Sequence, residues 1–263
     1  MKITSDIHIH THISDCAERD ASVERYLAAA KQDGIKTVGF SDHLWDDTVA
    51  EPPNWYRPQN VAHVLQLKSE ISKLKSDDIK ILFGCESEFT GDGVLALSEE
   101  HFELFDYVLV PHSHTHMARV MPREYVADHR LHAKFLMDSF MKLVEHPLSS
   151  RITAVAHPFA PGVKHENFNA VQTHIPDSYL REAFSAAKEK GIAIELNGSC
   201  LTYLPDEEIP RCEYVRIYTV AKECGCRFTY GSDSHSPDFA RKLPLIEQFF
   251  SQCGIGDGDL LSL

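Results

Sequence analysis

The chain alternates between short apolar runs, rich in β-branched residues, and longer polar segments with helical spacing. Seven of the apolar runs have the length of strands. They span residues 3–10, 37–41, 79–84, 107–110, 152–156, 193–196 and 227–230. Strands that alternate with helices in this way are typical of βα units. The pattern therefore predicts an α/β protein with a parallel sheet.

The segments between these runs carry the signals of helices. Val64, Leu67 and Ile71 recur at the spacing of one helix face. We expect helices over residues 22–31, 62–75, 125–144, 177–190, 213–224 and 237–250, the last with Pro237 in its first turn. We therefore predict a distorted (β/α)7 barrel of the TIM-like class, built as one domain from residues 1–263. An open doubly wound sheet is the alternative.

Charge and cysteine content narrow the functional classes. The 263 residues include 26 Lys and Arg against 39 Asp and Glu, a net charge of −13 that disfavours nucleic acid and anionic lipid as partners. Seven scattered cysteines without a CxxC pair indicate reduced thiols. We see neither a signal peptide nor an apolar run long enough to span a membrane. We therefore expect a cytoplasmic protein.

Histidines and carboxylates gather where the predicted strands end. In H-I-H, His8 and His10 alternate along a strand, so both imidazoles can face one centre while Ile9 faces away. Further candidates follow the later strands: Asp42 and His43, Glu86, His112 and His114, His157, and Asp233 with His235. The carboxyl ends of the strands in a barrel meet at one face, where sites are built. Mixed nitrogen and oxygen ligands there predict a multinuclear site for Zn²⁺, Mn²⁺ or Fe²⁺.

Several neighbouring residues leave alternatives open. Asp15 can fold back toward the centre or serve as a turn residue, and His12 is left out of the site. His112, His114 and His116 share one strand face, so the sequence does not separate them. Glu88 is expected to be an ordinary solvated glutamate. Asn197, which ends A-I-E-L-N, can bind a ligand or cap a turn.

In order along the chain, these motifs resemble the signatures of the polymerase and histidinol phosphatase (PHP) superfamily. The resemblance runs from residue 6 to residue 235 and implies a distorted seven-stranded barrel with two or three metals that hydrolyses phosphoesters. By position, it implies one metal on His8, His10, Glu86 and Asp233, a second that shares Glu86 and adds His157 and His114, and a third on Asp15, His43 and His235. His112 is the next choice after His114.

The resemblance implies hydrolysis of a small phosphomonoester, with histidinol phosphate as one family option. Bound metals lower the pKa of a coordinated water to about 7, so that a metal-bound hydroxide can attack phosphorus. His235 or His157 is the expected proton donor to the leaving group. Arg119 and Arg241, with Arg123 and Lys164 as further candidates, are expected to bind the phosphate. A nuclease-like phosphodiesterase and a metal-binding regulatory module without catalysis are the alternatives.

The loop of residues 46–59 contains Trp55 and Tyr56 among prolines. It is expected either to act as an aromatic lid over the site or to pack against the barrel. Loops of this kind carry substrate specificity more often than the strands do.

Overall fold

A parallel sheet forms the centre of the computed structural model, which describes residues 1–263 except 75, 77, 117–120, 163–167, 203 and 240. The strands are β1 (Ser5–Asp6), β2 (Thr37–Phe40), β3 (His43–Leu44), β4 (Lys80–Ser87), β5 (Tyr107–Pro111), β6 (Ala154–Ala156), β7 (Ala193–Asn197) and β8 (Phe228–Gly231). Their spatial order is β1-β2-β4-β5-β6-β7-β8, and β3 pairs with β4 just beyond β2. Because this order follows the chain without a reversal, the doubly wound alternative is wrong.

The first and last strands lie next to each other and bring the sheet close to a closed barrel. The amide of Ile7 donates to the carbonyl of Tyr230 at 3.0 Å, and the amide of His10 donates to the carbonyl of Ser234 at 2.9 Å. Ile9 also forms an isolated parallel bridge with Ser234. With β3 counted as the continuation of β2, seven strand positions surround the barrel, as predicted.

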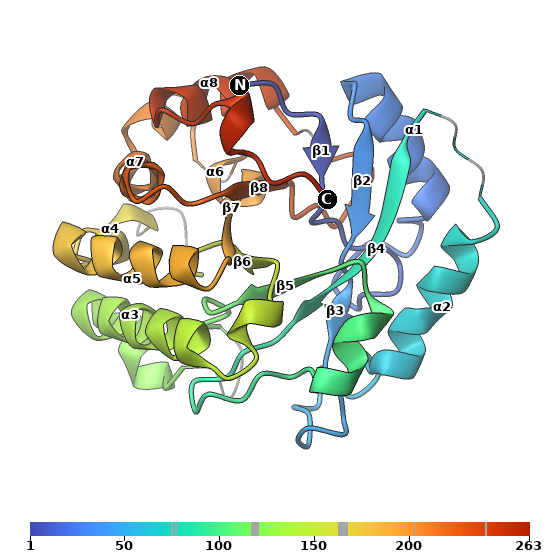
Figure 1. The fold of residues 1–263 in the computed structure, drawn as a ribbon, viewed down its shortest axis with the longest axis horizontal. Coiled ribbons are helices and arrows are strands. Elements are labelled where there is room, and N and C mark those ends of the chain that lie inside the picture. The colour runs from blue at the N-terminus through green and yellow to red at the C-terminus, as the bar shows by residue number, and fades with distance from the viewer. Residues whose placement is uncertain (75, 77, 117–120, 163–167, 203, 240) are drawn as a thin grey trace.

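Helices surround the outside of this sheet, with α1 and α2 on one side and α3, α5 and α7 on the other (Figure 1). The α-helices are α1 (Val23–Asp33), α2 (Val61–Ile71), α3 (His129–Glu145), α4 (Phe168–Gln172), α5 (Asp177–Glu189), α6 (Gly198–Thr202), α7 (Glu213–Glu223) and α8 (Leu243–Gln252). The 3-10 helices are η1 (Glu99–Leu104), η2 (Arg123–Ala127), η3 (Ser149–Arg151), η5 (Ile209–Arg211) and η6 (Asp257–Asp259). Within the described residues, no helix has the length and apolar character needed to cross a membrane.

Capping residues explain where the helices begin and end. The Ser22 hydroxyl accepts from the amide of Arg25 at the start of α1, and Gly34 ends that helix with a φ of 76°. Asp128 caps α3 and so divides the predicted helix 125–144 into η2 and α3. The prediction that the last helix begins at Pro237 was wrong, since α8 begins at Leu243 after Lys242 adopts a left-handed backbone.

Alternate residues of the strands separate two apolar cores. Tyr107 and Leu109 of β5 face the barrel interior, whereas Val108 and Val110 pack in the outer core against the helices. The interior core contains Ile7, Leu82, Tyr107, Leu109, Ala154, Ala156 and Ala193. By the same alternation, Glu86 of β4 lies on the interior face, four residues beyond Leu82 on the same side of the strand. The barrel interior is therefore apolar at one end and carries polar side chains at the carboxyl end of the strands.

The close packing of Tyr107 against Gly84 generates a stability prediction. A Cβ atom built at Gly84 would lie 2.3 Å from Cζ of Tyr107, whose hydroxyl donates to the carbonyl of Ile7 at 2.7 Å. We expect Gly84→Ala to lower the free energy of unfolding by about 1–3 kcal/mol, because the buried ring has no room to move. Gly258→Ala, where the added Cβ meets nothing within 4 Å, is the control and should change stability by less than about 0.5 kcal/mol. Equal denaturation midpoints for the two variants would contradict this account.

Candidate metal centre

Histidines and carboxylates from six parts of the barrel meet at the carboxyl end of its strands. Three groups of side chains each place their ligand atoms within 4.8 Å of one another. The groups are His8, His10 and Asp233; His10, His43 and His235; and Glu86, His114 and His157. His10 belongs to the first two groups, and Oε2 of Glu86 in the third lies 2.9 Å from Nδ1 of His43, so the three groups form one continuous cluster. Apart from Asp15, the predicted metal ligands are therefore brought together.

Glu86 lies at the centre of this cluster and faces histidines on both sides. Its Oε1 lies 2.9 Å from Nε2 of His157 and 3.6 Å from Nε2 of His114. Its Oε2 lies 2.9 Å from Nδ1 of His43 and 3.5 Å from Nε2 of His8. Glu86 is buried, and its Oε2 makes no hydrogen bond with the described part of the protein. The two oxygens are thus placed as those of a bridging carboxylate would be.

The outward ring nitrogens of four histidines are held by other side chains. The pairs are His8 Nδ1 with Glu195 at 2.6 Å, His10 Nδ1 with Ser14 at 3.3 Å, His114 Nδ1 with Glu88 at 2.8 Å, and His157 Nδ1 with Ser113 at 2.7 Å. The inward nitrogen is Nε2 in each of these four rings. Metal-binding histidines in proteins characteristically use their second ring nitrogen in this way, which orients the ring and sets its tautomer.

The electrostatics of the cluster favour ionised carboxylates and a neutral His10 but not neutral rings throughout. Burial disfavours the ionised forms of Glu86 and Asp233, but neighbouring histidines, His8 first, lower the pKa of each carboxyl below its usual value. Burial lowers the pKa of the His10 ring well below its ordinary value, and two adjacent histidines lower it further. Ionised carboxylates and neutral imidazoles are the states that bind divalent cations.

Burial opposes the charged forms of His8 and His114, but neighbouring carboxylates outweigh it. Glu195 raises the pKa of the His8 ring well above its ordinary value. Glu88 raises the pKa of the His114 ring to about 9. A bound cation would therefore replace a proton at these two rings.

Two residues of the cluster have left-handed backbone conformations. The φ of His157 is 29° and that of Asp233 is 53°. Strand alternation alone would place His157 on the outer face with Val155, so the turn after Ala156 is what brings the ring inward. Such conformations cost about 1–3 kcal/mol at a non-glycine residue and occur often at functional sites.

The three histidines of residues 112–116 have different surroundings. His114 joins the cluster, as favoured from the sequence. His112 is fully buried beside Phe140 and Phe159, and its Nε2 accepts the amide of Phe159 at 2.9 Å. His116 is exposed, with its ring centroid 5.5 Å from that of His114. Only His114 of the three therefore lies within the groups of clustered ligand atoms.

The structure corrects two predictions about carboxylates. Asp15, predicted as a ligand of a third metal, is exposed and belongs to none of the three groups within the described residues. Its amide donates to Oε1 of Gln59 at 3.1 Å, which fixes the loop with the side chain turned outward. Glu88, expected to be solvated, is buried and accepts from the hydroxyl of Tyr56 at 2.9 Å.

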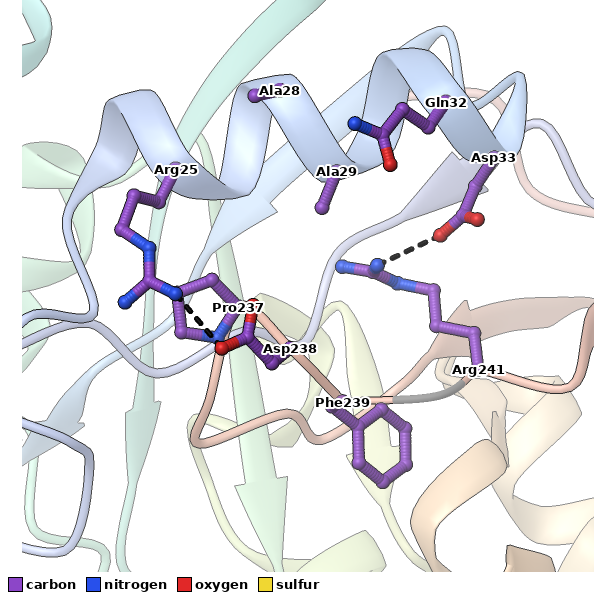
Figure 2. Close-up of a pocket in the computed structure, with 9 residues that line it drawn as sticks. All are labelled: Arg25, Ala28, Ala29, Gln32, Asp33, Pro237, Asp238, Phe239 and Arg241. Atoms are coloured by element: carbon purple, nitrogen blue, oxygen red, sulfur yellow. Dashed lines mark hydrogen bonds and ion pairs between the residues drawn. The ribbon is translucent and has the colours of Figure 1, made fainter.

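Arg241 does not have the position predicted for a phosphate ligand. Arg241 is 3% exposed, and its guanidinium bonds to Asp6 at 2.8 Å and to Asp33 of α1 at 2.9 Å, the latter shown in Figure 2. It lines a cleft of about 430 Å³ that none of the clustered residues lines. The prediction failed because Arg241 pairs with the buried Asp6 and the exposed Asp33. Arg119 and Lys164 lie outside the described residues, and Arg123 is exposed in η2.

The loop of residues 46–59 packs against the barrel, which was the second of its two expected roles. Trp45 and Tyr56 are buried with Ala96 in a separate apolar cluster. The half-buried Trp55 ring lies edge-on to His43, with centroids 5.1 Å apart. The loop therefore supplies one wall beside the cluster.

Sequence reasoning missed the supporting roles of Glu195 and Asp42, which hold residues of the cluster and its loop in place. Glu195 was given no role, although it lies at alternate positions with Asn197 in A-I-E-L-N, as His8 does with His10. Asp42 was listed beside His43, and the structure shows it fully buried, accepting from the amide of Thr11 at 2.7 Å and the hydroxyl of Ser14 at 2.7 Å. The alternate positions of Glu195 and Asn197 at the end of β7 were the signal in the sequence that could have identified Glu195.

Comparison with known proteins gives relatives along most of the chain. A family model described as the PHP domain matches residues 6–199. A protein named a probable phosphatase from Aeromonas hydrophila is 26% identical over 236 residues, which cover 89% of this chain and 79% of the relative. Another probable phosphatase, from Shewanella sp. (strain ANA-3), is 25% identical and covers 94% of this chain and 84% of its own length.

A solved structure shares the fold. It is that of histidinol phosphate phosphatase from Lactococcus lactis subsp. lactis, complexed with zinc, L-histidinol and phosphate. The TM-score is 0.64 at 16% sequence identity, and the match covers 97% of this chain and 95% of the other. Together with the motifs at the strand ends, the family match establishes that this chain belongs to the PHP domain family.

Proposed function

We propose that this protein is a metal-dependent phosphatase that hydrolyses a small phosphomonoester at the cluster around Glu86. The observation that carries the proposal is the placement of the two Glu86 oxygens, each facing different histidines within 2.9 Å. The names of the relatives support the phosphatase class, and the histidinol phosphate phosphatase with the same fold supports a small phosphorylated metabolite as substrate.

The residues fit a centre of two or three divalent cations. The buried Oε2 of Glu86 and Nδ1 of His43 have no hydrogen bond with the described residues, so both keep lone pairs available inside the cluster. Imidazole and carboxylate donors of this kind suit Zn²⁺, Mn²⁺ or Fe²⁺. We assign one ion to His8, His10, Glu86 and Asp233 and a second to Glu86, His114 and His157. A third ion would take His43 and His235, because the single inward nitrogen of His10 is already assigned to the first ion.

The bound cations and the surrounding residues would have separate roles in hydrolysis. When bound, such cations lower the pKa of a water ligand and neutralise the oxygens of the phosphoryl group. The net charge of the protein is negative, so phosphate binding relies on positive charge concentrated at this cluster. We further propose that Trp55, whose ring centroid lies 5.1 Å from that of His43, contacts the leaving group of the substrate.

His235 is the better placed of the two predicted proton donors. Both ring nitrogens of His157 are engaged, one with Ser113 at 2.7 Å and one with Glu86 at 2.9 Å. The His235 side chain is 36% exposed at the rim of the cluster, and its Nδ1 contacts the carbonyl of Asp233 at 3.0 Å. We therefore assign to His235, when no third ion is bound to its ring, the transfer of a proton to the leaving alkoxide, since one nitrogen cannot both bind a cation and carry that proton.

The proposal predicts metal content and substrate preference. Protein purified without chelator should contain at least two divalent transition-metal ions per chain. Chelation should abolish hydrolysis of p-nitrophenyl phosphate, and added metal should restore it. Faster turnover of bis-p-nitrophenyl phosphate than of the monoester would favour the phosphodiesterase alternative, and metal binding without either activity would favour the regulatory module.

Single substitutions test the assigned ligands. His8→Ala or Asp233→Ala should lower kcat/KM for the monoester by about 10³-fold or more, because metal catalysis contributes several kcal/mol to the barrier. The circular dichroism spectrum should remain that of the parent. His174→Ala, at an exposed histidine outside the cluster, is the control and should retain full activity. Full activity of either ligand variant would refute the assignment.

The dependence of rate on the leaving group tests His235. General acid catalysis contributes about 10²- to 10⁴-fold and matters most for poor leaving groups. His235→Asn should therefore lose far more activity toward an alkyl phosphate than toward p-nitrophenyl phosphate. An equal loss toward both esters, together with a lower metal content, would instead make His235 purely a metal ligand.

A further inference from the structure

We infer that Glu195 is a positioning residue that holds two proposed metal ligands, His8 and His157, in fixed positions relative to each other. This inference rests on the proposed function, since it concerns the same centre. Glu195 lies in β7, is completely buried, and belongs to none of the three groups of clustered ligand atoms. Its role would be to act through the residues that it touches.

The two carboxylate oxygens of Glu195 bond to two different cluster residues. Oε1 accepts from Nδ1 of His8 at 2.6 Å, and Oε2 accepts from the backbone amide of His157 at 2.6 Å. His8 and His157 belong to different groups of ligand atoms, and Glu86 lies between them. One buried side chain therefore links the ring of one proposed ligand to the backbone of another.

The bond to His8 determines which nitrogen of that ring faces the cluster. A carboxylate accepts but does not donate, so Nδ1 carries the proton and the lone pair of Nε2 is directed inward. Nε2 lies 3.1 Å from Nε2 of His10 and 3.5 Å from Oε2 of Glu86. Glu195 thereby favours the tautomer that a metal ligand needs and increases the basicity of the ring.

The bond to His157 supports a backbone that is otherwise unfavourable. His157 has a φ of 29°, and this turn directs its ring inward. Glu195 accepts its amide, while the Ser113 hydroxyl donates to its carbonyl at 2.9 Å. Two hydrogen bonds thus fix the peptide groups on both sides of the strained residue.

Asn197 and Gly231 confine the Glu195 carboxylate. Nδ2 of Asn197 donates to Oε2 of Glu195 at 3.0 Å and lies 3.4 Å from Oδ2 of Asp233. Gly231 of the neighbouring strand leaves space for the pair, since a Cβ atom there would lie 2.2 Å from Oε1 of Glu195 and 2.4 Å from Cβ of His8. The carboxylate is therefore surrounded by donors and by a strand with no side chain at the point of contact.

A carboxylate suits this position in a way that its amide isostere does not. Two donors, the His8 ring and the His157 amide, point at the two oxygens. Glutamine would present an NH₂ group to one of them, so that two donors would face each other. Glu195→Gln should therefore disturb His8 or His157 while changing the volume of the core very little.

The test measures metal affinity separately from activity. The dissociation constant for Zn²⁺ would be determined by competition with a chromophoric chelator, for the parent, Glu195→Gln and Glu247→Gln. Glu247 is the control because it also accepts a backbone amide, that of Ile3 at 2.8 Å, but lies in α8 away from the cluster. We expect about 10- to 100-fold weaker binding of at least one ion to Glu195→Gln, and parent affinity for the control.

Several outcomes would overturn the inference or separate it from the proposed function. Parent Zn²⁺ affinity in a folded Glu195→Gln variant would overturn it. If that variant does not fold, Asn197→Ala provides the second test, because it removes the donor to Oε2 of Glu195. This substitution should weaken Zn²⁺ binding by a smaller factor. Parent affinity in Asn197→Ala would overturn the inference. If the parent protein binds metal tightly but hydrolyses no phosphate ester, the proposed function fails while the affinities still decide the role of Glu195.

Discussion

The crowding of ionisable groups around the buried Glu86 carboxylate is the constraint on which the rest of this structure depends. A buried carboxylate is strongly unfavourable unless positive charge or hydrogen bonds compensate it. Here the ring nitrogens of five histidines lie within 3.6 Å of its two oxygens. Such an arrangement is costly for stability alone, and it is the arrangement that a shared divalent-cation site requires.

The barrel makes this concentration of donors attainable. Each parallel strand ends at the same face and delivers one or two side chains to the centre, so residues separated by more than two hundred positions become neighbours. The apolar interior core around Tyr107 and Leu109 closes the barrel below the site. Polar side chains are therefore confined to the end where solvent and substrate can arrive.

A set of hydrogen-bonded side chains surrounds the cluster and orients its histidines. Glu195, Glu88, Ser14 and Ser113 each hold the outward nitrogen of one histidine, and Asp42 fixes the loop that carries His10 through Thr11 and Ser14. These contacts restrict the rings to orientations in which Nε2 faces inward. The chemistry of the site thus depends on residues that do not themselves reach its centre.

The sequence by itself determined the order of strands and helices, the barrel class and most of the cluster. Periodicity and β-branched runs are local properties, and His8, His10, Glu86, His157 and Asp233 follow strands whose ends must meet. Only the tertiary structure distinguished His114 from His112, turned Asp15 outward, and paired Arg241 with Asp6 and Asp33. These outcomes depend on contacts between distant segments and on the left-handed turns at His157 and Asp233, neither of which strand spacing encodes. The support that Glu195 gives to His8 was hidden for the same reason, because 187 residues separate the two partners.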